Sequence, residues 1–222
     1  MADTLTVYPD PDPESTSVDG TVRRNVGTPE TFAVIRAGDG TAAYPSSTTT
    51  TLIQLSHSGD GDSWSYLNRS IFLFDTSQLP DLIEISSAVI SLYITANGSP
   101  STDTAHFCTV NPASNTDLAN ADYGTFGDTS FGSTAHADIT INQYNAWTLN
   151  ASGISAISVS GITKYGFRLG RDLNNDNEGV ETTRGSLNGL LADYADTTSD
   201  PKLVITYTSS RISQPMAQCM IY

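Results

Sequence analysis

The sequence predicts an all-β fold, specifically an antiparallel two-sheet β-sandwich of the jelly-roll type. Apolar residues come in short runs in which they often alternate with polar ones, the pattern of strands with one buried face. Turn pairs such as Asp39-Gly40, Asn97-Gly98 and Asp200-Pro201 separate the runs. Hydrophobic residues make up 38% of the chain, enough for a core at this length. We therefore expect one sandwich domain, residues 1–208, followed by a C-terminal tail, residues 209–222.

Four segments have the clearest strand patterns and are expected to form the core strands. Apolar residues occupy alternate positions in Ala88–Ile94, and the same spacing recurs in Tyr165–Leu169 and Leu203–Thr208. Ile71–Phe74 is apolar on both faces, as expected for a strand in the middle of a sandwich.

Weaker patterns predict further strands and a short helix. The strands are expected at Leu5–Tyr8, Phe32–Ile35, Leu52–Leu55, His106–Val110 and Ala137–Ile141. The helix is expected within Ala151–Ser158, where Ile154 and Ile157 lie three residues apart. Asn150 or Ser152 can cap its N-terminus.

The charge of the chain excludes several classes of partner. The formal net charge is -14, so the chain lacks the basic surface that nucleic acid requires, and an anionic membrane would repel it.

No run of apolar residues approaches the roughly 20 needed to cross a bilayer. The N-terminus lacks the basic and apolar regions of a signal peptide, so we expect synthesis in the cytoplasm of a host cell. Cys108 and Cys219 are far apart and indicate no disulfide framework.

Two segments resemble a known family. Arg69–Pro80, with the sequence RSIFLFDTSQLP, and the following Ile85–Ile94 are similar to the signature of DNRLRE-type domains. The segment Ser199–Tyr207, SDPKLVITY, resembles the last strand of that family. The resemblance implies a β-sandwich, and some domains of the family act as carbohydrate-binding modules beside polysaccharide-degrading enzymes.

A likeness over nearly the whole chain connects it with proteins of tailed bacteriophages that carry the same sandwich alone. The matching pieces are Tyr8–Asp10, Ser17–Gly20, Ile35–Gly38, Asn111–Thr116, Leu149–Gly153 and Gly161–Gly166. This resemblance implies a structural protein on the virion surface, such as a capsid decoration or an accessory fibre or tail protein, with other virion proteins as partners. The alternative is a carbohydrate-binding module, for which we would expect a leader, a linker and a catalytic neighbour.

The motifs of enzymes are missing from the sequence. His57, His106 and His136 have no metal-ligand spacing, and no nucleophile elbow, Walker loop or dinucleotide-binding fingerprint occurs. We therefore expect a non-catalytic protein that needs no cofactor.

One acidic segment is a candidate calcium site. Asp172, Asn174, Asp176 and Glu178 place oxygen-bearing side chains at alternate positions, as a calcium loop requires. The sixth position of such a loop is normally glycine but is Asn177 here, which excludes an EF-hand. A solvated acidic loop without metal is the alternative.

Two aromatic residues are candidates for glycan binding. Trp64 and Tyr66 lie in a polar stretch before the Ile71–Phe74 strand, where exposed rings could stack on sugars. Their alternation equally suits the start of a strand that faces the core or a subunit contact.

The tail holds more apolar residues than solvent exposure requires. Ile212, Met216, Met220 and Ile221 are candidates for a contact with a neighbouring subunit, or they pack on the same domain. Because a lone sandwich leaves sheet edges to be covered, we expect a homo-oligomer, with a trimer favoured.

Overall fold

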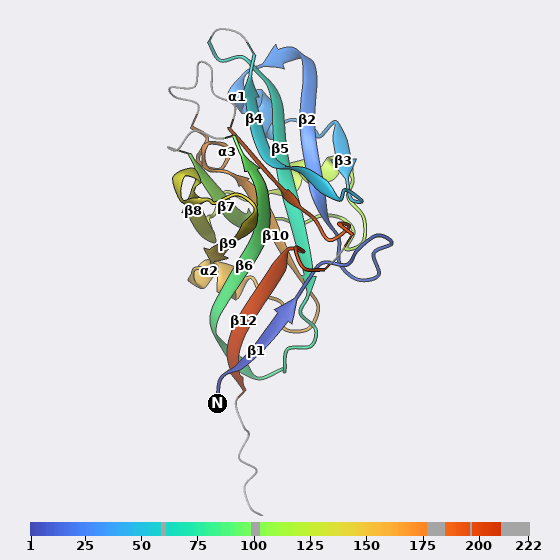
Figure 1. Cartoon of the computed structure of the whole chain (residues 1–222). Coiled ribbons are helices and arrows are strands. Elements are labelled where there is room, and N and C mark those ends of the chain that lie inside the picture. The colour runs from blue at the N-terminus through green and yellow to red at the C-terminus, as the bar shows by residue number, and fades with distance from the viewer. Residues whose placement is uncertain (59–60, 99–102, 177–184, 196, 210–222) are drawn as a thin grey trace, which may run out of the picture.

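The computed structural model describes residues 1–58, 61–98, 103–176, 185–195 and 197–209 (Figure 1). Its strands form one antiparallel twelve-stranded sheet. The strands are β1 (Asp3–Val7), β2 (Asp19–Glu30), β3 (Ala42–Tyr44), β4 (Thr49–His57), β5 (Trp64–Asp75), β6 (Ile83–Asn97), β7 (Thr104–Thr109), β8 (Gly132–Ala135), β9 (Gln143–Thr148), β10 (Ile162–Leu169), β11 (Gly185–Leu190) and β12 (Lys202–Ser209). The predicted antiparallel β-rich fold is thus confirmed.

The strands are not arranged in sequence order. The main path runs β1-β12-β6-β11-β4-β5-β10-β7-β8, while β2 lies beside β5 with β3 next to it, and β9 lies beside β6. The long strands β5 and β6 each pair with three others, so they connect the rest of the sheet.

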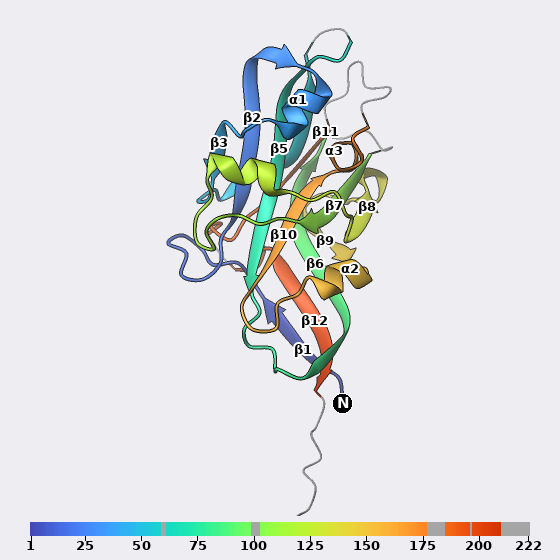
Figure 2. The ribbon, with the colours of Figure 1, turned by 180° about the vertical axis from the view of Figure 1, so that it is seen from behind.

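The sheet curls so that distant strands face each other across the core. Trp147 of β9 packs edge-on against Phe107 of β7 and Phe167 of β10, with ring centroids 5.7 and 5.2 Å away. The Trp147 indole N–H also donates to the carbonyl of Ala105 at 3.0 Å. Figure 1 shows β6 and β12 in front of β10, and the reverse view in Figure 2 shows β10 in front of them.

The four predicted core strands are present, within β5, β6, β10 and β12. In β6 the alternating residues Ala88, Ile90, Leu92 and Ile94 are completely buried. Ile71–Phe74 in β5 is buried on both faces, as its sequence predicts. Of the weaker predictions, Leu5–Tyr8, Leu52–Leu55 and His106–Val110 fall largely on β1, β4 and β7.

Two strand predictions are wrong. Phe32–Ile35 begins α1 (Phe32–Ala37): the Thr31 hydroxyl caps this helix by accepting from the Val34 N–H, and Phe32 and Ile35 are buried one turn apart. Ala137–Ile141 lies between β8 and β9, where η2 (His136–Asp138) is followed by a turn. Asn142 in that turn has a φ of 61°, which interrupts an extended strand.

The remaining helices are short. They are η1 (Asn120–Thr125), α2 (Ala151–Ser155) and α3 (Gly170–Asn174). The predicted helix is α2, and Asn150 is its cap because its side chain accepts from the Gly153 N–H at 3.0 Å. Within the described ranges, no helix has the length and apolar character needed to cross a membrane.

One carboxyl group is buried where the start of β2 meets the segment after β11. Asp19 is 1% exposed, and the Ala192 N–H donates to its Oδ2 at 3.1 Å. Burial raises the pKa of Asp19 well above its ordinary value, and the acidic groups of Asp193 and Asp200 raise the pKa further. The ionised form of Asp19 is therefore unfavourable in the folded protein.

Replacing this carboxyl should stabilise the protein at neutral pH. Because the pKa of Asp19 is higher in the folded than in the unfolded state, the free energy of unfolding of the wild type falls as the pH rises from the unfolded-state pKa to the folded-state pKa. The amide of asparagine does not titrate, so the variant has no such loss. We expect Asp19→Asn to raise the Tm at pH 7 by about 2–4 °C, the equivalent of about 1 kcal/mol. The difference should vanish below the unfolded pKa, and thermal melts at several pH values check both statements. A lower Tm for the variant than for the wild type at pH 7 would contradict the raised pKa of Asp19.

Candidate functional site

The outer face of β4, β11 and β6 forms a surface of neutral polar side chains. In β6, Leu92 and Ile94 point into the core, so Tyr93 and Thr95 lie on the opposite face. In β11, Asn188 pairs with Thr51 of β4 and with Ala96 of β6. Strand alternation thus gathers hydroxyl, amide and phenol groups over three adjacent strands.

Two adjoining hollows follow this face. One has a volume of about 290 Å³ and is lined by Thr49, Thr50, Thr51, Thr95 and Asn188. The other has a volume of about 530 Å³ and is lined by Thr49, Tyr93, Thr95, Asn142, Leu190, Tyr194 and Ser199. Because Thr49 and Thr95 line both, the hollows form one depression, which we call the neutral groove. Among the residues that the structure describes, none that lines the neutral groove carries a charge.

The two tyrosines of the neutral groove differ in their contacts and their exposure. The Tyr93 hydroxyl donates to the carbonyl of Asn142 at 2.8 Å, and its ring meets the Tyr144 ring edge-on at 5.7 Å. Tyr194 lies in a turn in which its N–H donates to the Leu191 carbonyl at 3.0 Å. Its side chain is 39% exposed. One anchored ring and one exposed ring therefore lie beside hydroxyl and amide groups, which suits a ligand with both apolar faces and hydroxyls.

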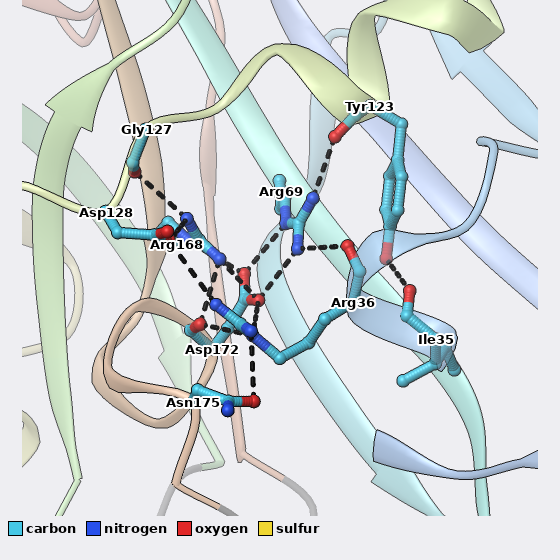
Figure 3. A network of polar contacts seen from close by, with 9 residues as sticks. All are labelled: Ile35, Arg36, Arg69, Tyr123, Gly127, Asp128, Arg168, Asp172 and Asn175. Carbon is cyan, nitrogen blue, oxygen red and sulfur yellow. Dashed lines mark hydrogen bonds and ion pairs between the residues drawn. The ribbon is translucent and has the colours of Figure 1, made fainter. Parts of the chain in front are cut away.

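A second cluster of polar residues is buried beside α3 (Figure 3). Asp172 is completely buried; two arginines bind its carboxylate closely, and the Nε of a third, Arg36, lies 3.3 Å from its Oδ1. Arg69 of β5 donates from Nε and Nη2 at 2.8 Å each, and Arg168 of β10 donates from Nε at 2.8 Å and Nη2 at 2.7 Å. Burial alone would raise the pKa of Asp172, but the two guanidinium groups lower it well below its ordinary value. Asp172 is therefore held as an anion.

The same cluster connects α1 and the loop that precedes β8. Arg36 of α1 donates from Nε to the backbone carbonyl of Asp172 at 2.6 Å and from Nη1 to Asn175 at 3.0 Å. Asp128 accepts from Arg36 at 3.3 Å and from Arg168 at 3.0 Å. These contacts fasten α1, β5, β10 and α3 to one another, so the cluster supports the fold.

The predicted calcium ligands do not converge in the described residues. The Asp172 carboxylate points toward Arg69 and Arg168, and a calcium ion would have to displace them (Figure 3). Asn174 is the last residue of α3 and, like Asp176, is exposed, while Glu178 lies outside the described residues. No group of three His, Cys, Asp or Glu in the described ranges is arranged to hold a metal. Calcium binding by this segment stays a prediction.

The two predicted glycan-binding aromatics differ in their surroundings. Trp64 is 1% exposed, its ring packs 5.1 Å from that of Phe32, and its N–H donates to Asp62 at 2.8 Å. Trp64 therefore faces the core, which was the alternative interpretation of its sequence pattern. Tyr66 is half-buried, with its ring 5.7 Å from the guanidinium of Arg23. Sequence reasoning missed Tyr93, whose alternation with Leu92 and Ile94 could have marked it as outward-facing.

Several titratable groups are buried in neutral form. The His106 ring lies between the hydroxyls of Thr104 and Ser130, at 2.7 and 2.8 Å, and burial lowers its pKa. Burial also lowers the pKa of His136 to about 4 and raises the pKa of the Cys108 thiol to about 12. These side chains remain uncharged near pH 7.

The tail residues Ile212, Met216, Met220 and Ile221 lie outside the described residues.

No known family model matches the chain. A comparison with curated proteins also found no match.

Proposed function

We propose that this chain is a non-catalytic structural protein on the surface of a tailed bacteriophage particle, where it adheres to neutral glycans through the neutral groove. The observation that carries the adhesive role is the groove itself, whose described lining combines two tyrosines with threonine and asparagine side chains and includes no charged residue. Uncharged hydroxyl and amide groups exchange hydrogen bonds with sugar hydroxyls, and tyrosine rings cover the apolar faces of sugar rings. The phage-like sequence segments support the location on a virion.

The finer fold that we propose is the two-sheet jelly roll. The contacts of Trp147 with Phe107 and Phe167 join strands that are far apart along the sheet path, which supports two packed layers. A sandwich of this kind supplies a broad outer face for binding without needing a deep cavity.

The state of the buried groups supports a non-catalytic role. A thiol with a pKa of about 12 is a poor nucleophile at neutral pH, and Asp172 is committed to two arginines. His136, with a pKa of about 4, has little capacity to take up protons at pH 7.

A glycan array tests the adhesive role. We expect weak binding to neutral oligosaccharides, strengthened when the protein is presented in several copies. Sulfated and uronate polymers should bind less because the net charge is -14. Strong binding to acidic polymers that weakens with salt would contradict the choice of the neutral groove, and so would the absence of any binding by a multivalent form.

The location and the oligomeric state have separate tests. We propose a symmetric homo-oligomer, with a trimer favoured, in which the tail covers a subunit contact; several weak sites would then act together. The full chain should co-purify with phage particles at a fixed stoichiometry. Light scattering should show that deletion of residues 209–222 converts the oligomer into a monomer. If the chain is absent from particles but binds glycans, the carbohydrate-binding module is the better description.

A further inference from the structure

A hollow of about 270 Å³ opens beside the buried aspartate cluster. It is lined by Arg36, Arg69, Arg168, Phe126 and Asp128, together with small residues. Figure 3 shows the three arginines arranged around Asp172, with Asp128 approaching Arg168 from the opposite side. We call this hollow the arginine pocket. It lies at α1, β5 and β10 and shares no lining residue with the neutral groove.

The positive and negative groups at the arginine pocket differ in number and in burial. Three guanidinium groups face one fully buried carboxylate, that of Asp172. The other carboxylate, Asp128, has a side chain that is 70% exposed, whereas the Arg168 side chain is 2% exposed and that of Arg36 is 16% exposed. Asp128 therefore reaches from solvent onto two mostly buried cations, which is the position that a bound anion would take.

The arginines keep hydrogen-bond donors beyond those already used. A guanidinium has five N–H groups, with two on each terminal nitrogen. Among the described residues, Nη1 of Arg36 donates only to Asn175 and Nη2 only to Asp128, so each retains a second hydrogen. Within the described part of the chain, Nη1 of Arg69 donates only to the Tyr123 carbonyl and likewise retains one hydrogen.

The arginine positions are fixed before any ligand arrives. The Arg69 guanidinium lies 4.3 Å from the centre of the Tyr123 ring and 5.4 Å from that of Phe126, and Asp172 binds both Arg69 and Arg168 through paired hydrogen bonds. Guanidinium groups held in this way match the planar or tetrahedral oxygens of a carboxylate or sulfate.

We propose that the arginine pocket binds a small oxyanion, a carboxylate or sulfate group, which takes the place of the Asp128 carboxylate. Displacement is easy because Asp128 needs only to turn into the solvent that already surrounds most of its side chain. The volume of the pocket limits the occupant to a small group. This site is independent of the proposed glycan adhesion.

An NMR titration of the arginine Nε–H signals tests the site, with sodium sulfate and sodium acetate as probes at an ionic strength held constant with sodium chloride. The Arg36 and Arg69 signals should shift saturably in the wild type. Asp128→Asn should bind each probe several-fold more tightly, because its competing carboxylate is removed. Arg36→Gln should lose about tenfold or more in affinity, and Arg36→Lys should lose most of it as well, because an ammonium lacks the guanidinium fork.

Arg24→Gln is the matched control. The side chain of Arg24 is 17% exposed, close to the 16% of Arg36, and it pairs with Glu30; neither residue lines the arginine pocket. Its substitution should leave anion binding unchanged. The proposal is overturned if neither probe shifts the arginine signals of the wild type and of Asp128→Asn, or if Arg36→Gln and Arg36→Lys bind the probes as tightly as the wild type does.

Discussion

Asp172→Asn should lower the free energy of unfolding by about 3–5 kcal/mol, the range for removing one partner from a buried ion pair. The carboxylate is fully buried and is bound by Arg69 and Arg168 through four hydrogen bonds of 2.7–2.8 Å. An amide would leave two buried guanidinium groups without their counter-charge. Urea denaturation at pH 7 measures the loss.

Asp128→Asn is the control, because it removes a carboxylate that contacts the same cluster but is 70% exposed. Its effect should stay within about 1 kcal/mol. The pKa of Asp172 in the folded protein lies well below its ordinary value of 3.8. Its contribution to the free energy of unfolding is therefore fully present above the unfolded-state pKa and is lost as the pH falls from there toward the folded-state pKa. The gap between wild type and Asp172→Asn should therefore narrow below about pH 4. Equal denaturation midpoints for the two variants would contradict a stabilising role of Asp172.

Trp147→Ala should cost about 3–5 kcal/mol, because it opens a cavity between strands that face each other across the core. The ring is completely buried against Phe107 and Phe167, and its N–H bonds to the Ala105 carbonyl. Thermal or urea unfolding measures the loss. We expect the transition to remain cooperative, since the facing strands belong to one continuous sheet.

Trp147→Phe separates the two contributions of the side chain. It retains most of the aromatic packing and loses the hydrogen bond, so a cost of about 1–2 kcal/mol is expected. If the alanine variant lost no more stability than the phenylalanine variant, the packing across the curled sheet would not hold the fold together as described.

The strand patterns predicted from the sequence succeeded where one or both faces are buried. Ala88–Ile94 and Ile71–Phe74 are examples, because burial enforces the period of two or the continuous apolar run. Phe32–Ile35 failed because a four-residue apolar run suits a short helix as well, and the cap at Thr31 decided the outcome. The strand β2 was not predicted at all; its residues from Asn25 onward are mostly exposed and lack the alternation.

The candidate sites were less accessible to sequence reasoning. The sequence marks Asp172 by the oxygen atoms near it, but its carboxylate binds two arginines. Arg168 is four residues away, whereas Arg69 is 103 residues away, a distance that no local spacing reveals. The neutral groove likewise combines residues of β4, β6 and β11 with Tyr194 from the segment after β11. Only the outward position of Tyr93 and Thr95 in β6 could be predicted from the sequence.

The affinity of two tyrosine variants for one neutral oligosaccharide tests the central claim most directly. Tyr194 is 39% exposed in the neutral groove, and Tyr8 is 42% exposed outside it, so the variants Tyr194→Ala and Tyr8→Ala remove similar rings from different places. With the neutral oligosaccharide that binds best on the array, calorimetry should show a loss of about tenfold for Tyr194→Ala, equivalent to about 1.4 kcal/mol, and no loss for Tyr8→Ala. Equal affinities for Tyr194→Ala and the wild type would contradict adhesion through the neutral groove.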